Sequence, residues 1–139
     1  MMRIEHANIV VTEIEPTLNF LTTAFPDWGV RGGGEADWYG TKRNWVHVGN
    51  DDSYFTLNDR GTGVQRHLQG NSAGLAHIAF EVDDLDGLVQ RMTDAGFEPR
   101  VFGDEHPFRK NVYYIDPDGL EFEFVEYLSD DPAEKNMYD

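Results

Sequence analysis

Three side chains in this sequence are of types that bind a divalent metal ion: His6, His77 and Glu123. Two imidazoles and one carboxylate on the same side of a sheet would form a three-ligand site with open positions. Such a site suits Fe(II), Mn(II), Ni(II) or Zn(II) acting on a coordinated oxygen substrate. Taken singly, a histidine within a strand is more often a hydrogen-bonded structural residue, and a glutamate on the outer face of a strand is usually solvated. Their spacing alone does not establish that the three converge.

The two histidines occupy matching positions of a weak internal repeat. At a shift of 71 residues, which superimposes His6 on His77, the segment IEHANIVVTEIEPTLNFLTTAF lies over LAHIAFEVDDLDGLVQRMTDAG. The alignment continues without a gap for about twenty positions and reproduces the apolar pattern, as expected of a duplicated unit.

Each copy is predicted to begin with a strand, an acidic turn and a helix. The first helix is expected to end near Pro26 and the second at Ala95-Gly96, with Phe97 starting the next strand. Short strands are then predicted at 45–48 and 54–57 in the first copy, and at 111–115 and 120–127 in the second. The tetrapeptide Asp116-Pro117-Asp118-Gly119 is typical of a hairpin turn.

These elements predict an α+β fold of two βαβββ modules within one domain, residues 1–128. Module one covers 3–58, a polar linker covers 59–74 and module two covers 75–128. The acidic tail, 129–139, is expected to be mobile or to dock on a partner. The glycine run 32–34 lacks the spacing of a nucleotide-binding motif and is interpreted as a flexible connection.

Strand parity separates the candidate ligands from the apolar residues of the same strands. Side chains alternate between the two faces of a strand. The His6 side chain is therefore on the other face of its strand from Ala7 and Ile9, and the His77 side chain is on the other face from Ile78. On the last strand, Glu121 and Glu123 lie opposite a face formed by Leu120, Phe122 and Phe124. All three candidate ligands avoid the face expected to pack against a helix.

A histidine in the first strand of both copies, followed by DPDGLEFEF with Glu123 seven residues after Asp116, resembles the vicinal oxygen chelate superfamily over roughly residues 3–128. That superfamily includes glyoxalases, bleomycin-resistance proteins and extradiol dioxygenases. The resemblance implies paired βαβββ modules around a cupped mixed sheet, with His6, His77 and Glu123 as metal ligands. Glyoxalase I has a fourth ligand, a carboxylate, where the repeat alignment places Thr56. The remaining set is more similar to that of dioxygenases and fosfomycin-type transferases.

Two further residues are candidates for catalysis. Tyr113 lies ten residues before Glu123 on the adjoining predicted strand, and similar tyrosines in the resembling families contact bound substrate. Its phenol would donate a hydrogen bond or take part in proton transfer, although tyrosine is also ordinary in strands. His106, in the predicted loop 105–110, is the leading spare acid or base, and Arg109 would hold a substrate carboxylate or phosphate. Loop charges are more often simply solvated.

The aromatic and cationic segment 38–48 suits either the wall of a ligand cavity or a dimer interface, and His47 within it is interpreted as structural. The resemblance implies a homodimer, since small members of the superfamily commonly pair two chains.

Composition restricts the range of partners. The net charge of -15 opposes binding to nucleic acid or anionic membranes. The absence of cysteine leaves His, Asp, Glu and backbone oxygens as metal ligands. With no long apolar stretch and no signal peptide, the protein is expected to be soluble and cytoplasmic.

Two function classes follow from the resemblance. The first is a metal-dependent enzyme with dioxygenase, isomerase, lyase or transferase chemistry on a small oxygen-bearing substrate. The alternative is a non-catalytic binder of a cationic drug, similar to bleomycin-resistance proteins, which generally lack the three ligands.

Overall fold

The computed structural model describes residues 1–138. The chain divides into two compact units, with the boundary between Val64 and Gln65. We call residues 1–64 unit 1 and residues 65–138 unit 2. Each unit contains one four-stranded sheet and is described by itself below. No helix among the described residues is long and apolar enough to cross a membrane.

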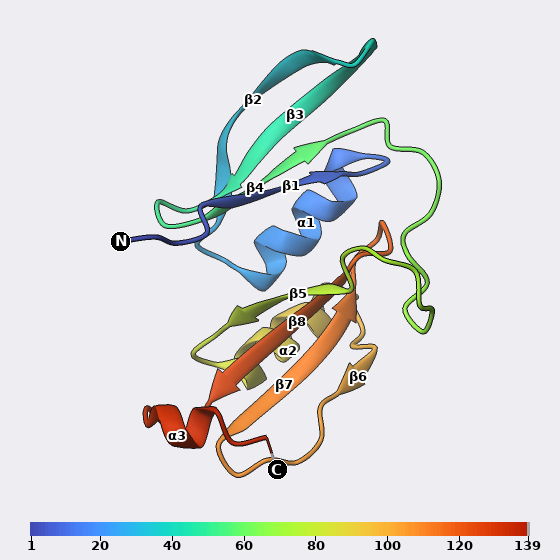
Figure 1. Ribbon diagram of the computed structural model, residues 1–139. Coiled ribbons are helices and arrows are strands. Elements are labelled where there is room, and N and C mark those ends of the chain that lie inside the picture. Colours follow the sequence, from blue (N-terminus) through green and yellow to red (C-terminus); the bar gives the residue numbers. More distant parts are fainter. Residues whose placement is uncertain (139) are drawn as a thin grey trace. The chain divides into compact units, whose positions relative to one another are not determined.

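Unit 1 contains one complete βαβββ module (Figure 1). Its strands lie in the order β1-β4-β3-β2, with β1 parallel to β4 and the other neighbours antiparallel. The elements are β1 (His6–Val10), α1 (Ile14–Ala24), β2 (Gly29–Trp38), β3 (Thr41–Gly49) and β4 (Tyr54–Asn58).

Unit 2 repeats this topology, with strands in the order β5-β8-β7-β6 and β5 parallel to β8. Its elements are β5 (His77–Glu81), α2 (Leu85–Asp94), β6 (Val101–Phe102), β7 (Arg109–Ile115), β8 (Glu121–Tyr127) and α3 (Pro132–Lys135). The two-module α+β fold predicted from the repeat is therefore confirmed. The polar segment 59–76 contains no helix or strand.

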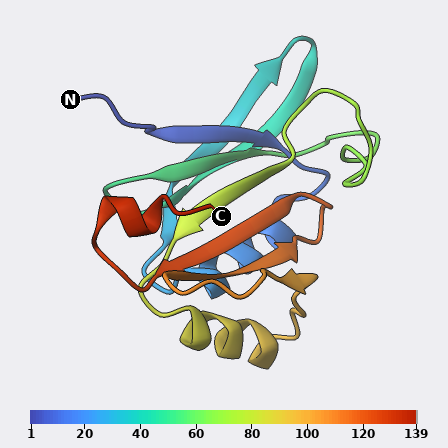
Figure 2. The ribbon, with the colours of Figure 1, turned by 60° about the horizontal axis from the view of Figure 1, so that its bottom comes forward.

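One helix covers the apolar face of each sheet. In unit 2, α2 buries Leu85, Leu88 and Met92, and the facing strand β8 buries Phe122 and Phe124 completely. Figure 2 shows α2 lying along one face of that sheet. In unit 1, α1 buries its own apolar stripe in the same way. The apolar stripe of the helix and the apolar face of the sheet thus form one core in each unit. The opposite face of the sheet is left for polar side chains.

The ends of the two helices differ in their capping. Asp84 precedes α2 and its side chain accepts a hydrogen bond from the Gly87 N–H at 3.0 Å. Glu13 occupies the same place before α1 and makes no side-chain cap hydrogen bond. A carboxylate one methylene closer to the backbone reaches the free N–H groups of the first turn more readily. The second helix therefore has a stabilising interaction that the first lacks.

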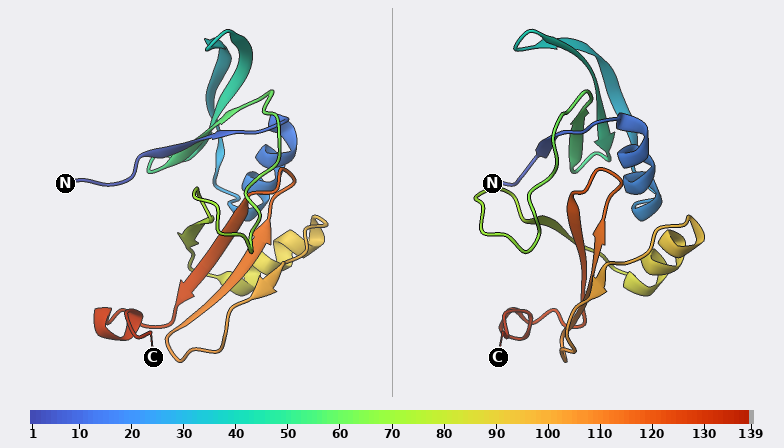
Figure 3. Two further views of the ribbon diagram at one scale, coloured as in Figure 1. Left: turned by 45° about the vertical axis from the view of Figure 1, so that its right-hand side comes forward. Right: turned by 90° about the vertical axis from the view of Figure 1, so that its right-hand side faces the viewer.

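The glycine run 32–34 is not the flexible connection that the sequence suggested. It lies within β2, paired with His47, Val46 and Trp45 of β3. Glycine is unfavourable within a strand, but backbone pairing with β3 holds these residues extended. The β2–β3 hairpin extends beyond β4, because β4 pairs only with Trp45–Gly49 of β3 (Figure 3).

Two expectations for unit 2 also change. The strand predicted to start at Phe97 begins at Val101, since Phe97 instead closes α2 by donating its N–H to the Met92 carbonyl. The C-terminal segment includes the short helix α3, on the side of β7 and β8 away from α2 (Figure 3). Lys135 contacts Glu81 and the ring of Tyr127, so the segment docks on its own unit. Asp139 lies outside the described residues.

Candidate functional site

His77 and Glu123 meet on the face of the unit 2 sheet that α2 does not cover. Strand β5 runs parallel to β8, with His77 opposite Glu121 and Ala79 opposite Glu123. His77 Nε2 lies 3.1 Å from Glu123 Oε2. The Glu123 side chain is only 15% exposed, whereas that of His77 is 37% exposed. Two of the three predicted ligands are therefore brought together by the register of one parallel strand pair.

Asn111 and Tyr113, from the neighbouring strand β7, fix the Glu123 carboxylate. Asn111 Nδ2 donates to Glu123 Oε1 at 2.9 Å. Burial raises the pKa of Tyr113, and the charge of Glu123 and a hydrogen bond to it act in the same direction. The phenol therefore stays protonated at neutral pH, which makes it a hydrogen-bond donor. Asn111 was missed by the sequence reasoning, although it shares its strand face with Tyr113.

A second carboxylate supports the opposite edge of His77. Glu121 Oε1 lies 3.8 Å from His77 Nδ1, and the Glu121 side chain is 8% exposed. Arg100, immediately before β6, donates its Nε–H to Glu121 Oε2. Removing a carboxylate from water is costly unless a cation and hydrogen-bond donors compensate, and Arg100 supplies both. The parity of β8 placed Glu121 on this face but did not reveal its partner.

His6 lies in unit 1 and has a similar immediate environment. Its Nδ1 lies 2.8 Å from Glu5 Oε1, and its ring stacks on Tyr54 at 4.8 Å between centroids. Tyr54 also donates its hydroxyl to Glu5 Oε1 at 3.1 Å. The hydrogen bonds from His6 and Tyr54 lower the pKa of Glu5. In both units a carboxylate thus lies beside Nδ1 of the strand histidine.

The position equivalent to Glu123 in unit 1 is Thr56. Thr56 pairs with Asn8 of β1 and with His47 of β3, as Glu123 pairs with Ala79 of β5 and Tyr113 of β7. The strand register thus agrees with the repeat alignment, and no carboxylate of β4 takes this place. His47 occupies the position of Tyr113, and burial lowers its pKa, so its neutral form is favoured.

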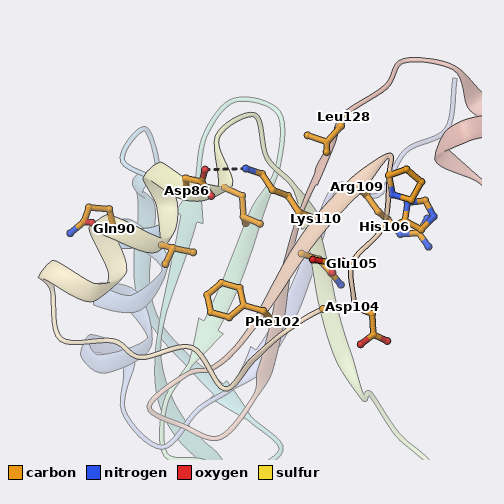
Figure 4. A pocket seen from close by; sticks show the side chains of 14 residues that line it. Asp86, Gln90, Phe102, Asp104, Glu105, His106, Arg109, Lys110 and Leu128 are labelled. Carbon is orange, nitrogen blue, oxygen red and sulfur yellow. Dashed lines mark ion pairs between the residues drawn. The ribbon is translucent and has the colours of Figure 1, made fainter.

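Two grooves of unit 2 adjoin Asn111, and one of them also adjoins Tyr113. One, of about 570 Å³, is lined by Asn111 and Tyr113 together with His106, Arg109 and Tyr138. The other, of about 810 Å³, lies between α2 and the β6–β7 connection (Figure 4). There Asp86 of α2 points toward Lys110, with 3.1 Å between Oδ2 and Nζ, and Phe102 lines the groove. The first groove gives a small molecule access to the side of Tyr113.

His106 and Arg109 hold the C-terminal segment in this structure. The Phe108 N–H donates to His106 Nδ1 at 3.0 Å, and His106 Nε2 lies 2.8 Å from the Met137 carbonyl. Arg109 donates to the Lys135 carbonyl at 3.1 Å and its guanidinium lies over the ring of Tyr138. Both residues line the grooves, and their roles toward a substrate stay predictions.

The sequence model of the Glyoxalase/Bleomycin resistance protein/Dioxygenase superfamily matches residues 3–124. The chain belongs to this superfamily. Members have been seen with metal: the fosfomycin resistance protein FosX from Listeria monocytogenes, in complex with Mn(II) and sulfate, superimposes with a TM-score of 0.67 and 17% identity, over 99% of both chains.

Two further similarities differ in how much of the chain they cover. The superfamily domain from Frankia sp. EAN1pec superimposes with a TM-score of 0.75 and 20% identity, also over 99% of both chains. At these identities the likeness establishes the shared fold. The uncharacterized protein YwkD from Bacillus subtilis (strain 168) is 33% identical over 63 residues, which are 45% of this chain and 49% of that protein. The match therefore spans about half the length of this curated relative.

The residues of unit 2 fit a divalent metal of the kind that superfamily members bind. Two ligand atoms held about 2.1 Å from one ion, at an angle between octahedral and tetrahedral values, are separated by about 3.0 to 3.4 Å. The 3.1 Å between His77 Nε2 and Glu123 Oε2 falls in this range. No group of three or more His, Asp or Glu side chains is assembled as a metal site within residues 1–138. Since His6 belongs to unit 1, the three-ligand set stays a prediction.

Proposed function

We propose that this protein is a metal-dependent enzyme of the glyoxalase and dioxygenase superfamily that acts on a small oxygen-bearing substrate. The proposed ligands of the divalent ion, Fe, Mn, Ni or Zn, are His6, His77 and Glu123. The observation that carries the proposal is the convergence of His77 and Glu123 at 3.1 Å on a sheet face, with the carboxylate held by Asn111. The Mn(II) complex of FosX supports Mn(II) as the first ion to test.

The chemistry of the site depends on the open positions that a three-ligand set leaves. A divalent ion there supplies a Lewis acid that binds neighbouring substrate oxygens and stabilises developing negative charge. Dioxygenase, isomerase, lyase and transferase reactions all use this property, and the ligand set is shared among them.

The protein residues around the pair have separate tasks in this proposal. Tyr113, protonated at neutral pH, donates a hydrogen bond to the substrate oxygen that gains negative charge. Asn111 and Glu121 fix the orientations of Glu123 and His77, so that neither ligand must reorient during reaction. His106 is the proposed additional acid or base, and Arg109 the proposed contact for an anionic substrate group, both on the groove beside Tyr113.

Elemental analysis of untagged protein, purified anaerobically without chelator, tests this proposal. Wild type should retain about one divalent ion per chain, and His77→Ala and Glu123→Gln should lose it, since each removes a donor. Thr56→Val is the matched control, because it alters the equivalent position of unit 1 without removing a proposed ligand. An equal metal content in wild type and Glu123→Gln would show that the site is wrong.

A drug-binding function remains the second candidate, supported by the exposed aromatic tip of the β2–β3 hairpin. Tyr39 is 94% exposed and Trp38 is 38% exposed, in a chain of net charge -15 that would attract a cationic ligand. Wild-type protein that carries no metal and binds a cationic aromatic compound tightly would favour this function.

We also propose that the protein is a homodimer. Light scattering of the purified protein during size-exclusion chromatography tests this.

A further inference from the structure

Gly103 follows β6 directly and faces Asn111 on β7, to which it is joined by a backbone hydrogen bond from its N–H to the Asn111 carbonyl at 3.0 Å. A Cβ atom at Gly103 would overlap Asn111 Oδ1 and would lie 2.5 Å from Asn111 Cγ and 2.8 Å from Nδ2. The backbone of Gly103 is not in the left-handed region. Glycine is therefore favoured at this position by the space that the Asn111 side chain occupies, and not by backbone conformation.

The space at Gly103 is filled by a side chain with a defined orientation. The Glu123 carboxylate can only accept hydrogen bonds, so the Asn111 amide must turn its Nδ2 toward Glu123 Oε1, at 2.9 Å. Its second proton is directed to the Tyr113 hydroxyl, with 3.4 Å between Nδ2 and Oη. Asn111 Oδ1 is then left on the side of Gly103. Any larger residue at 103 would displace the amide from the carboxylate.

Unit 1 has the same arrangement with different occupants. Gly34 on β2 pairs with Trp45 on β3, and a Cβ at Gly34 would lie 3.5 Å from Trp45 ring atoms. The Trp45 ring lies beside His47, 4.8 Å between centroids. In each unit a glycine on the edge strand faces a bulky side chain of the next strand. The contact at Gly34 is an ordinary van der Waals distance, whereas the one at Gly103 leaves no room for a methyl group.

We propose that Gly103 and Asn111 act as a positioning pair for Glu123. Gly103 leaves room for the Asn111 amide, and the amide holds Oε1 so that Oε2 faces His77 Nε2. Neither residue is a proposed metal ligand. The pair rests on the proposed function in one respect, that Glu123 is a ligand, and its geometry is independent of that assignment.

The metal-free protein provides the first test, through the side-chain amide signals of Asn111 in a ¹H–¹⁵N spectrum. These signals are assigned by their loss in Asn111→Ala. They should shift in Glu123→Gln, which replaces the acceptor, and in Gly103→Ala, which displaces the amide. Gly32→Ala is the matched control on the edge strand of unit 1, because a Cβ there meets no atom within 4 Å. Unchanged Asn111 signals in folded Gly103→Ala would overturn the positioning pair.

The second test measures Mn(II) affinity from the electron paramagnetic resonance signal of free Mn(II). Gly103→Ala and Asn111→Ala should each weaken binding about 10- to 100-fold, as is usual when the partner of a metal ligand is lost. The double variant should bind as weakly as either single variant, because both changes remove one interaction. A loss of Mn(II) affinity in the double variant equal to the product of the two single losses would contradict the pair. Asn111→Ala tests the same interaction if Gly103→Ala does not fold. Wild type that binds none of Mn(II), Fe(II), Ni(II) and Zn(II) would refute the proposed function, and the amide signals alone would then decide on the pair.

Discussion

The sheet faces that point away from α1 in unit 1 and from α2 in unit 2 share a backbone framework and differ in chemistry. Register places His6 and His77 at one position, Thr56 and Glu123 at a second, and His47 and Tyr113 at a third. The remaining matched pairs are Tyr54 with Glu121, Trp45 with Asn111 and Gly34 with Gly103. Unit 1 presents stacked rings where unit 2 presents two carboxylates and their partners.

This difference shows what a sheet must supply to hold a largely buried carboxylate. Glu121 and Glu123 are nearly buried, and Arg100 and Asn111 provide the donors that replace water. Unit 1 has Arg31 over the Tyr54 ring, 4.2 Å from its centroid, and the Trp45 ring beside that of His47 at an interplanar angle of 48°. In unit 1 these side chains contact rings, whereas Arg100 and Asn111 contact carboxylates in unit 2.

The largest expected effect concerns the matched core positions Leu57 and Phe124, both completely buried. Phe124→Ala should lower the free energy of unfolding by about 3 to 5 kcal/mol and Leu57→Ala by about 2 to 5 kcal/mol, since each leaves a cavity behind its sheet. Urea titration followed by tryptophan fluorescence and circular dichroism measures both. A loss under about 1 kcal/mol in either variant would contradict the packing of that unit.

Removal of the arginine beside each face should distinguish an ion pair from a ring contact. Arg100→Ala leaves the Glu121 carboxylate buried without its cation and should cost about 1 to 3 kcal/mol. Arg31→Ala removes a cation–π contact with Tyr54 and should cost about 0.5 to 1 kcal/mol. Equal costs, measured by urea unfolding at neutral pH, would remove this distinction between the units. Arg100→Lys controls for the charge.

The two helix caps predict a smaller difference. Asp84→Ala removes the hydrogen bond to the Gly87 N–H and should cost about 1 kcal/mol. Glu13→Ala should have little effect, because Glu13 makes no cap hydrogen bond. Thermal unfolding of both variants and of Asp84→Asn, which retains a capping oxygen, checks the comparison. A Glu13→Ala loss as large as that of Asp84→Ala would show that capping does not distinguish the helices.

The smallest effect depends on pH. Asn44 donates to Asp59 at 2.9 Å, and this hydrogen bond lowers the pKa of Asp59. A lowered pKa in the folded state stabilises the protein above the ordinary value, and the contribution is lost as pH falls through the folded pKa. Asn44→Ala should therefore be slightly less stable than wild type at neutral pH. The two proteins should be equally stable at a pH low enough to protonate Asp59 in both.

Carboxyl ¹³C NMR of Asp59 during an acid titration measures the lowered pKa directly.

The matched pair of unit 2, Lys110 and Glu126, is an ion pair with 3.8 Å between Nζ and Oε2. Its stabilising effect should decrease with added salt, whereas the Asn44 effect should change less, because a neutral donor is less screened. A larger salt dependence for Asn44→Ala would contradict this assignment.

The repeat of His6 and His77, with the apolar rhythm around each, predicted two modules of strands and one helix each, but no strand was predicted where β2 lies. Alternation also placed Glu123 opposite Phe122 and Phe124, because a period of two fixes the face of every side chain once one face is buried. The sequence failed where a local signal was overridden by pairing. Glycines 32–34 appeared flexible, and β3 holds them in an extended strand.

The candidate site itself required the third dimension. The types of His77, Tyr113 and Glu123 are properties of the sequence, and so is the absence of a carboxylate at Thr56. The partners Asn111 and Arg100 come from neighbouring strands, and Gly103 matters only because the Asn111 amide fills its space. A sequence determines which face a side chain takes, since that depends on local periodicity. Only the tertiary structure decides which atoms meet there, since that depends on the register between strands distant in the chain.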